Sequence, residues 1–188
     1  RENLRWGRAN ATDEEIEAYY AANAETIGVS QEEGKVVDVR HILVVPKGGT
    51  QDEQGKTTYS EEEWEACRKA AEEILNQWKA GAADEAYFAQ LATEKTEDPG
   101  SQATGGLYTN VYEGQMVTEF NDWCFDESRK YGDTDLVETE YGVHIMYYVS
   151  ADGDYYQHVL LQDMREADYS EWYKETGKKY TTEYSNFG

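Results

Sequence analysis

A strand pattern near residue 35 and a hairpin pattern near residue 140 enclose a series of helical patterns, and this order constrains the fold most. Lys35–Val45 has the sequence KVVDVRHILVV, in which alternate side chains, His41 among them, share one face. The stretches TDLVETE and YGVHIMYYVS predict two further strands joined by a turn at residues 140–142. Strands that are separated by helices and close in a hairpin predict an α+β fold with an antiparallel sheet.

Helical patterns occupy the interval between these strands. The clearest runs from Ser60 to Gly81, where Ser60 and Glu63 form a capping box and apolar residues recur at three- and four-residue spacing. Two shorter helices and one short strand are also predicted, at residues 84–94, 114–125 and 107–111 respectively. The glycine-rich segment EDPGSQATGGLY, residues 97–108, predicts a tight loop that leads into the short strand.

Two more helical patterns flank this central part. Thr12 and Glu15 form a capping box for a helix that continues to Ala24, and residues 158–180 predict a second helix. The first eight residues, RENLRWGR, could be the end of another helix, and a short tail follows residue 180. We therefore predict three segments: an N-terminal helical segment at 1–34, a central domain at 35–150 and a C-terminal helical segment at 151–188.

The chain is strongly acidic, with 39 acidic and 17 basic residues and a formal net charge of −22. Nucleic acids are bound through Lys and Arg that displace counterions, so we expect no nucleic-acid partner, and an anionic membrane surface is disfavoured likewise. The acidic residues are spread along the chain, which favours a solvated surface. Calcium binding is the weaker alternative, because neither residues 133–135 nor 152–154 have the required ligand pattern.

The two cysteines, Cys67 and Cys124, lack metal-ligand spacing and lie in helical patterns, so we expect them to pack as small apolar groups. The sequence leaves open whether they pair. It has no apolar run of the ~20 residues that a spanning helix needs. Because the chain begins at Arg1 rather than Met, we expect a trimmed form of a longer protein, whose compartment cannot be judged from a missing signal.

His41 and His144 are two of only three histidines, and they lie in the first and last predicted strands. Taken alone, each is most simply a strand residue with a satisfied hydrogen bond. The motifs around them, however, resemble in order and spacing the parvulin family of peptidyl-prolyl cis/trans isomerases. These motifs are RHIL at 40–43, FAQLA at 88–92, TEDPGSQATGG at 96–106, GQMVTEF at 114–120 and TEYGVHIM at 139–146. The resemblance covers residues 36–150.

The resemblance implies a four-stranded antiparallel sheet surrounded by helices, with an active site on one sheet face. It implies a prolyl isomerase that needs no cofactor or metal and acts on proline-containing unfolded or partly folded polypeptides. The implied catalytic residues are His41, Asp98, His144, Thr139 and Tyr141, and the implied substrate-binding residues are Leu107, Met116 and Phe120. The chain departs from the family pattern once, with GGLY where GGDLG is usual, so a shift of one residue would replace Leu107 by Tyr108.

The chemistry implied by the resemblance is physically reasonable for such a site. Rotating an amide costs ~18–20 kcal/mol because the C–N bond loses its resonance, and no bond has to be cut. An apolar socket for the proline ring and a polar surround that favours the twisted amide are sufficient, and each factor of ten in rate needs about 1.4 kcal/mol of differential binding. No nucleophile is required, and neither cysteine has an activating context.

Three alternatives stay open at this point. Met116, Phe120 and Trp123 at helical spacing could simply be core residues. His41, His144 and Asp98 could form a zinc site, although nothing in their spacing favours it. Finally, the loop PKGGTQDEQGKTTY, where one branch of parvulins clamps a phosphate, offers only Lys47 and Lys56, offset by acidic neighbours, so we expect little dependence on phosphorylated substrates.

The flanking helices resemble in position those of bacterial extracytoplasmic foldases, in which segments before and after the isomerase domain form a chaperone module. We therefore expect an extracytoplasmic protein, secreted or membrane-anchored, that assists the folding of exported proteins, and a module truncated upstream. The competing functional class is a non-catalytic chaperone that retains the fold. Exposed aromatic residues on these helices would favour a client-binding surface, and buried ones would favour simple padding.

Overall fold

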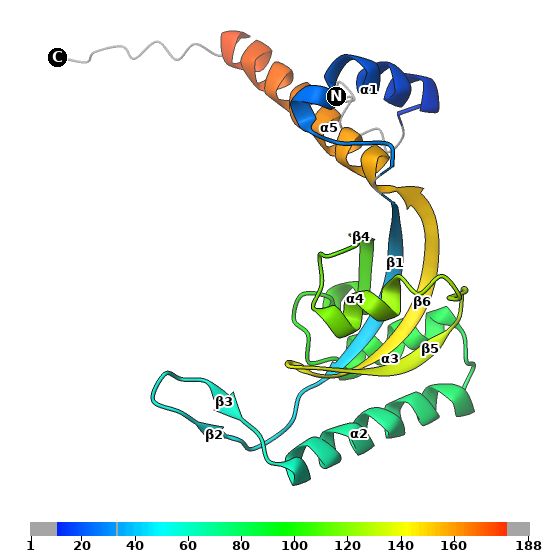
Figure 1. The fold of residues 1–188 in the computed structure, drawn as a ribbon, viewed down its shortest axis with the longest axis vertical. Coiled ribbons are helices and arrows are strands. Elements are labelled where there is room, and N and C mark those ends of the chain that lie inside the picture. The colour runs from blue at the N-terminus through cyan, green and yellow to red at the C-terminus, as the bar shows by residue number, and fades with distance from the viewer. Residues whose placement is uncertain (1–10, 33, 180–188) are drawn as a thin grey trace, which may run out of the picture. The chain divides into compact units, whose positions relative to one another are not determined.

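The computed structural model describes residues 11–32 and 34–179 and divides them into two compact units (Figure 1). The larger unit spans Lys35–Gly153. The smaller unit combines the described residues up to Gly34 with those from Asp154 onward. Segments from the two ends of the chain therefore share one unit, while the central residues form the other.

A four-stranded sheet organises the larger unit. Its strands, in spatial order, are β4 (Leu107–Tyr112), β1 (Lys35–Val44), β6 (Gly142–Asp154) and β5 (Thr134–Thr139). The pairs β1–β4 and β5–β6 are antiparallel, with Val37 opposite Val111 and Val137 opposite His144. A separate two-stranded ribbon consists of β2 (Thr50–Gln51) and β3 (Thr57–Thr58) and projects from this unit in Figure 1. The two longest strands, β1 and β6, therefore lie at the centre of the sheet.

Helices cover both faces of this sheet, because alternate residues of the central strands are apolar on each side. On one face, α2 (Glu61–Ala80) and α3 (Glu85–Lys95) pack against a buried cluster that includes Ile42 and Ile145. On the other face, α4 (Thr118–Cys124) packs against a second cluster that includes Val39 and Met146. His41 and His144 alternate with Ile42 and Ile145, so both histidines belong to the α4 face.

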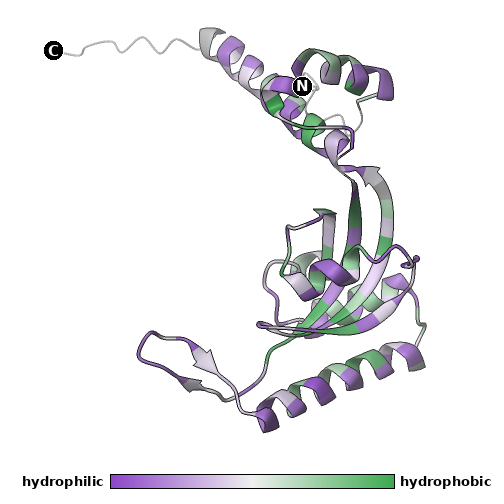
Figure 2. Cartoon of the chain, viewed as in Figure 1, coloured by the Kyte–Doolittle hydropathy of each residue, from purple (hydrophilic) through white to green (hydrophobic). Residues whose placement is uncertain are grey.

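Local sequence signals explain where the longest helix of this unit begins and which side it buries. Ser60 and Glu63 form the predicted capping box of α2, and Gly81 follows its last residue. Hydrophobic and hydrophilic residues alternate along α2 in Figure 2, as expected for a helix with one buried side. Cys67 on α2 and Cys124 on α4 are free and buried, in agreement with the predicted apolar packing.

The smaller unit contains helices α1 (Asp13–Ile27) and α5 (Tyr155–Lys179). Thr12 and Glu15 form the predicted capping box of α1. A buried cluster of Ile16, Val29, Tyr156 and Leu160 joins the two helices. Two tyrosine hydroxyls add polar links between them, Tyr19 to Asp163 at 2.6 Å and Tyr156 to Glu17 at 3.1 Å. The interpretations of residues 1–8 and of the tail after 180 lie outside the described residues.

One predicted helix is shorter than expected. The pattern at residues 114–125 predicts a helix throughout, whereas α4 begins only at Thr118. Gly114 has a positive φ of 85°, and its N–H donates to Asn121 Oδ1 at 2.7 Å, so residues 113–117 form a turn instead. Met116 therefore lies ahead of the helix. Within the residues that the structure describes, no helix is long and apolar enough to cross a membrane.

Candidate active site

Two buried histidines lie at the centre of the α4 face. His41 on β1 is 2% exposed and His144 on β6 is 6% exposed. The adjacent strands bring the two Nδ1 atoms to 3.1 Å and the ring centroids to 5.2 Å. Because the facing atoms are both Nδ1, one ring donates this hydrogen bond and the other accepts it.

Asp98 approaches His41 from the glycine-rich loop. Its Oδ2 lies 3.0 Å from His41 Nε2. The same oxygen accepts hydrogen bonds from Ser101 Oγ and from the Tyr108 hydroxyl, the latter at 2.8 Å, while Oδ1 accepts the Gly100 N–H at 3.1 Å. The carboxylate is therefore held by four donors, three of which come from its own loop and the strand that follows.

Close backbone contact fixes this loop against β1. Gly106 has a φ of 75°, its carbonyl accepts the His41 N–H at 2.9 Å and its own N–H donates to the Ser101 carbonyl at 2.8 Å. A Cβ at position 106 would lie 2.2 Å from the His41 carbonyl oxygen. Glycine is therefore required here, because both the backbone angle and the available space exclude a side chain.

Thr139 binds the far side of the histidine pair. Its Oγ1 lies 2.9 Å from His144 Nε2 and accepts the Tyr141 N–H at 3.2 Å. Tyr141 makes this contact through its backbone N–H, and the residue as a whole is 58% exposed. The β5–β6 hairpin thus fixes the second histidine through a buried hydroxyl.

Burial and hydrogen bonding determine the charge state of these groups. Burial, with a smaller effect of the neighbouring His41, lowers the pKa of His144 to about 4. Burial also lowers the pKa of His41, against the attraction of Asp98. Burial acts to raise the pKa of Asp98, but hydrogen bonds from Ser101, Tyr108 and Gly100 outweigh it and bring the pKa to about 2. At neutral pH the site holds one carboxylate and two neutral imidazoles.

These charge states give the hydrogen bonds a single direction. The ionised Asp98 can only accept, so His41 Nε2 carries the proton and His41 Nδ1 accepts from His144 Nδ1–H. His144 Nε2 is then unprotonated and accepts from the Thr139 hydroxyl. The hydrogen-bond chain runs from the β5–β6 hairpin to the loop carboxylate, and Ser101 Oγ lies 3.1 Å from His41 Nε2 at its far end.

Apolar groups line the histidine pair. The buried Phe120 ring on α4 contacts both imidazoles edge-on, with centroids 5.5 Å from His41 and 5.3 Å from His144. Met116 and Tyr108 are partly buried against the same cluster. The structure therefore places Phe120, one of the three predicted pocket residues, beside the histidines, and Met116 against the apolar cluster that contains Phe120.

The third predicted wall residue is displaced by one position. Leu107 pairs with Arg40 in the β1–β4 register, so its side chain lies on the opposite face of the sheet from His41. Tyr108 pairs with Val39 instead and stacks on His41, with centroids 4.8 Å apart and 26° between the ring planes. Tyr108 thus takes the place that the sequence analysis assigned to Leu107.

Sequence reasoning also missed Ser101. This residue is fully buried, bonds Asp98 and lies with its Oγ 3.1 Å from His41 Nε2. The available signal was a small polar side chain three residues after Asp98 in a tight loop, a spacing that permits local hydrogen bonding.

The geometry does not favour the zinc alternative. Each ring nitrogen of His41 and His144 has a hydrogen-bond partner in the described network, so none points toward a shared vacant position. Among residues 11–32 and 34–179 no group of three or more His, Cys, Asp or Glu has a geometry that could hold a metal ion.

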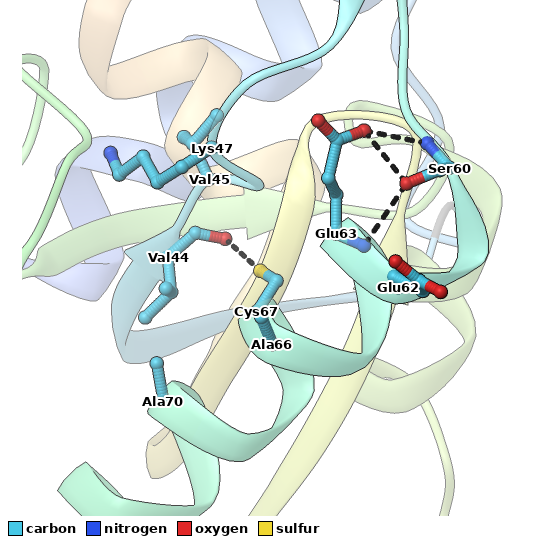
Figure 3. Close-up of a pocket in the computed structure, with 9 residues that line it drawn as sticks. All are labelled: Val44, Val45, Lys47, Ser60, Glu62, Glu63, Ala66, Cys67 and Ala70. Carbon is cyan, nitrogen blue, oxygen red and sulfur yellow. Dashed lines mark hydrogen bonds between the residues drawn. The ribbon is translucent and has the colours of Figure 1, made fainter.

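A separate pocket of about 390 Å³ lies beside the end of β1 and the first turns of α2 (Figure 3). Several of its polar groups have local partners: Glu63 and Ser60 form the capping box of α2, and the Cys67 thiol donates to the Val44 carbonyl at 3.1 Å. Burial raises the pKa of that thiol. The pocket therefore lacks the convergent network found around the histidines.

Comparisons with known proteins identify the family to which this chain is similar. The family model of the PPIC-type PPIase domain matches residues 25–150. The foldase protein PrsA of Halalkalibacterium halodurans is 32% identical over 139 residues, which cover 72% of this chain and 31% of that protein. The foldase protein PrsA of a Geobacillus species is 39% identical over 79 residues, which cover 42% of this chain and 26% of that protein.

A solved structure shares the fold. The crystal structure of PrsA from Bacillus subtilis matches with a TM-score of 0.56 and 26% identity, covering 95% of this chain and 59% of that chain. The chain spans between 26% and 40% of the length of the curated relatives that it matches.

Proposed function

Because the chain belongs to the family of PPIC-type peptidyl-prolyl isomerase (PPIase) domains, we propose that it catalyses cis/trans isomerisation of X-Pro bonds. Its substrates are proline-containing unfolded or partly folded polypeptides, and its role is to assist the folding of exported proteins. The observation that carries the proposal is the directed chain of hydrogen bonds from Thr139 to Asp98, lined by Phe120, Met116 and Tyr108.

The site suits a reaction that breaks no covalent bond. An X-Pro amide must lose its resonance to rotate, and a site accelerates rotation by binding the twisted amide better than the planar one. The Phe120 ring, Met116 and Tyr108 provide an apolar wall for the proline ring. The imidazoles and Asp98 form a polar surface whose orientation is fixed before substrate binds, so little reorganisation is needed.

Each residue has a proposed role. His41 and His144 hold each other in defined tautomers and shape the floor of the site. Thr139 donates to His144 Nε2 and holds that ring in place, and Tyr141 supports Thr139 through its backbone N–H. Asp98 supplies a negative charge beside His41 that adjusts the field where the carbonyl of the rotating amide lies.

The loop after β1 supports the expected independence from substrate phosphorylation. Lys47 forms an ion pair with Glu97 and is therefore not available as an isolated cation. Arg40, on the opposite sheet face, is bonded to Glu85 at 2.9 Å and to the carbonyls of Thr104 and Gly105. A phosphate group needs several converging donors, and these cations have local partners instead.

The smaller unit has a feature that favours a second role, client binding by a chaperone-like module. Tyr169 and Tyr173 on α5 are 50% and 66% exposed, and the ring of Tyr169 lies against those of Trp172 and Tyr173. Exposed aromatic side chains are a common feature of surfaces that bind polypeptides. This feature also supports the alternative function, a non-catalytic chaperone that retains the fold. We propose an extracytoplasmic location in keeping with a foldase role.

The deciding experiment is NMR exchange spectroscopy on short peptides that differ in the residue before proline, with and without catalytic amounts of the protein. We expect acceleration that is lost in a His144→Ala/Phe120→Ala double variant and reduced in Asp98→Ala. Tyr131→Phe, an exposed substitution on the other sheet face, serves as the matched control. No acceleration for any peptide, from protein with a folded spectrum, would leave the chaperone function as the better proposal.

A further inference from the structure

Tyr108 touches both charged and uncharged members of the site with one side chain. Its hydroxyl donates to Asp98 Oδ2 at 2.8 Å, and its ring stacks on His41 at 4.8 Å between centroids. The two contacts lie at opposite parts of the residue, the polar tip and the aromatic face. An aliphatic side chain of similar size could provide a pocket wall but could make neither contact.

We propose that Tyr108 is a positioning residue of the isomerase site, which holds the Asp98 carboxylate against His41 Nε2 and keeps the His41 ring in one plane and one tautomer. This inference rests on the proposed function and extends it, because it separates the hydroxyl of Tyr108 from the apolar wall that its ring provides.

Donors from two directions hold the Asp98 carboxylate. Its side chain is 17% exposed, so water can reach the carboxylate. Ser101 and Gly100 bind it from its own loop, whereas Tyr108 binds it from β4, a strand paired directly with β1. Tyr108 is thus the second donor, after His41 itself, that ties Asp98 to the sheet. Without it, the bond to His41 is the only side-chain link described between this carboxylate and the sheet.

The tautomer of His41 depends on the position of Asp98. The direction of the hydrogen-bond chain depends on Asp98 accepting from His41 Nε2, since only then does His41 Nδ1 accept from His144. If Asp98 were displaced or protonated, it would no longer keep the proton on His41 Nε2. Both imidazoles could then exchange tautomers. The orientation of the floor would then vary among molecules.

The charges around Asp98 are consistent with this arrangement. The titratable groups that face it are His41 from β1 and Tyr108 from β4, with His144 from β6 beyond His41. Burial, followed by the bond to Asp98, raises the pKa of Tyr108 to about 12, so Tyr108 stays a donor throughout the physiological range. The reciprocal effect on Asp98 keeps the carboxylate ionised.

The test compares Tyr108→Phe, which keeps the ring and removes the hydroxyl, with Tyr108→Leu, which removes both contacts. For Tyr108→Phe we expect the pKa of the Asp98 carboxyl, followed by carbon-13 NMR, to rise by about one unit. We expect kcat/KM for an X-Pro peptide to fall about three- to tenfold through kcat, with KM little changed. Tyr108→Leu should raise KM as well.

Controls separate positioning from a general structural effect. Tyr131→Phe should change neither the Asp98 titration nor the rate. In an Asp98→Asn background, Tyr108→Phe should cause almost no further loss, because the bond it removes has already lost its charged acceptor. Additive losses in this cycle, or a Tyr108→Phe protein with parental rate and an unshifted Asp98 pKa, would overturn the proposal.

The titration also distinguishes failure of the inference from failure of the proposed function. If the parent protein does not accelerate exchange, the isomerase function fails, and the Asp98 pKa and the His41 nitrogen-15 shifts still decide the positioning role without turnover. A raised Asp98 pKa and averaged tautomer shifts in Tyr108→Phe would support positioning. Unchanged values in both would reject it.

Discussion

The two histidines meet through atoms of the same kind, so the site works only if something outside the pair decides which ring donates. The ionised Asp98, 3.0 Å from His41 Nε2, sets that direction because it can only accept, and the Thr139 hydroxyl, 2.9 Å from His144 Nε2, then donates at the other end. Residues outside the histidine pair can therefore control the orientation of both rings. At the scale of single residues, the site depends on hydrogen-bond direction as much as on the identity of the two histidines.

Thr139→Val tests this dependence, because valine has nearly the same shape but no hydroxyl. It leaves His144 Nε2 and the Tyr141 N–H without partners, which should lower the free energy of unfolding by about 1–3 kcal/mol and reduce exchange activity. Urea denaturation and peptide exchange would measure both effects. Thr139→Ser should restore most of each, and Thr134→Val on the same strand should change little; a silent Thr139→Val would contradict the assignment.

The neutral histidines predict a dependence of stability on pH. The pKa of His144 is lowered from 6.5 to about 4 in the folded protein, so between these values the unfolded chain binds more protons. The contribution of neutral His144 to the free energy of unfolding is on the order of 3 kcal/mol. It is fully present above pH 6.5 and is lost as the pH falls toward 4. The lowered pKa of His41 acts in the same direction.

Urea denaturation at pH 7 and pH 5 would measure this change. His144→Gln should show a shallower pH dependence than the parent, and the difference between the two proteins separates His144 from the many surface carboxylates. NMR titration of the imidazoles, with His158→Gln to assign the third histidine, should give folded pKa values below 6.5 for both site residues. Equal pH dependence in the variant and the parent would contradict the prediction.

At the scale of elements, the approach of β4 to β1 sets the site. Gly106→Ala places a methyl group 2.2 Å from the His41 carbonyl oxygen at a φ of 75°, so β4 must move and Tyr108 and the Asp98 loop move with it. We expect a loss of roughly 3 kcal/mol or more and a loss of activity. Gly114→Ala is the matched control, with a φ of 85° but open space, and should cost only about 1–2 kcal/mol. Equal urea midpoints for the two variants would contradict this account.

Elements also show how far sequence reasoning can reach. Alternation predicts that His41 and His144 lie on sheet faces, and the family and its fold, with a four-stranded sheet and helices, are confirmed by the family match and the topology. Alternation cannot set the register between strands, and a shift of one residue exchanges the two faces, which is how Tyr108 replaces Leu107. The sequence did not predict Ser101 as a site residue, because a loop serine is usually exposed and only the folded loop buries it.

At the scale of the whole molecule, the proposed isomerase residues all lie within one of the two units. Every residue from His41 to His144 belongs to Lys35–Gly153, which has buried clusters on both sheet faces. A unit with its own core can in principle fold alone. We therefore predict that a fragment of residues 35–153 folds and keeps peptide exchange within about twofold of the parent rate, because peptide substrates are small and the network is complete within it.

The fragment also separates the two proposed roles. The smaller unit carries the exposed tyrosines Tyr169 and Tyr173, so the fragment should lose any ability to suppress aggregation of an unfolded client protein while it retains exchange on short peptides. Light scattering of a denatured client and peptide exchange, measured on the same preparations, would test both statements. Tyr169→Ser/Tyr173→Ser in the full chain should reproduce the loss of client protection without changing the exchange rate. A folded fragment that protects clients as well as the parent would place the client-binding surface on the isomerase unit instead.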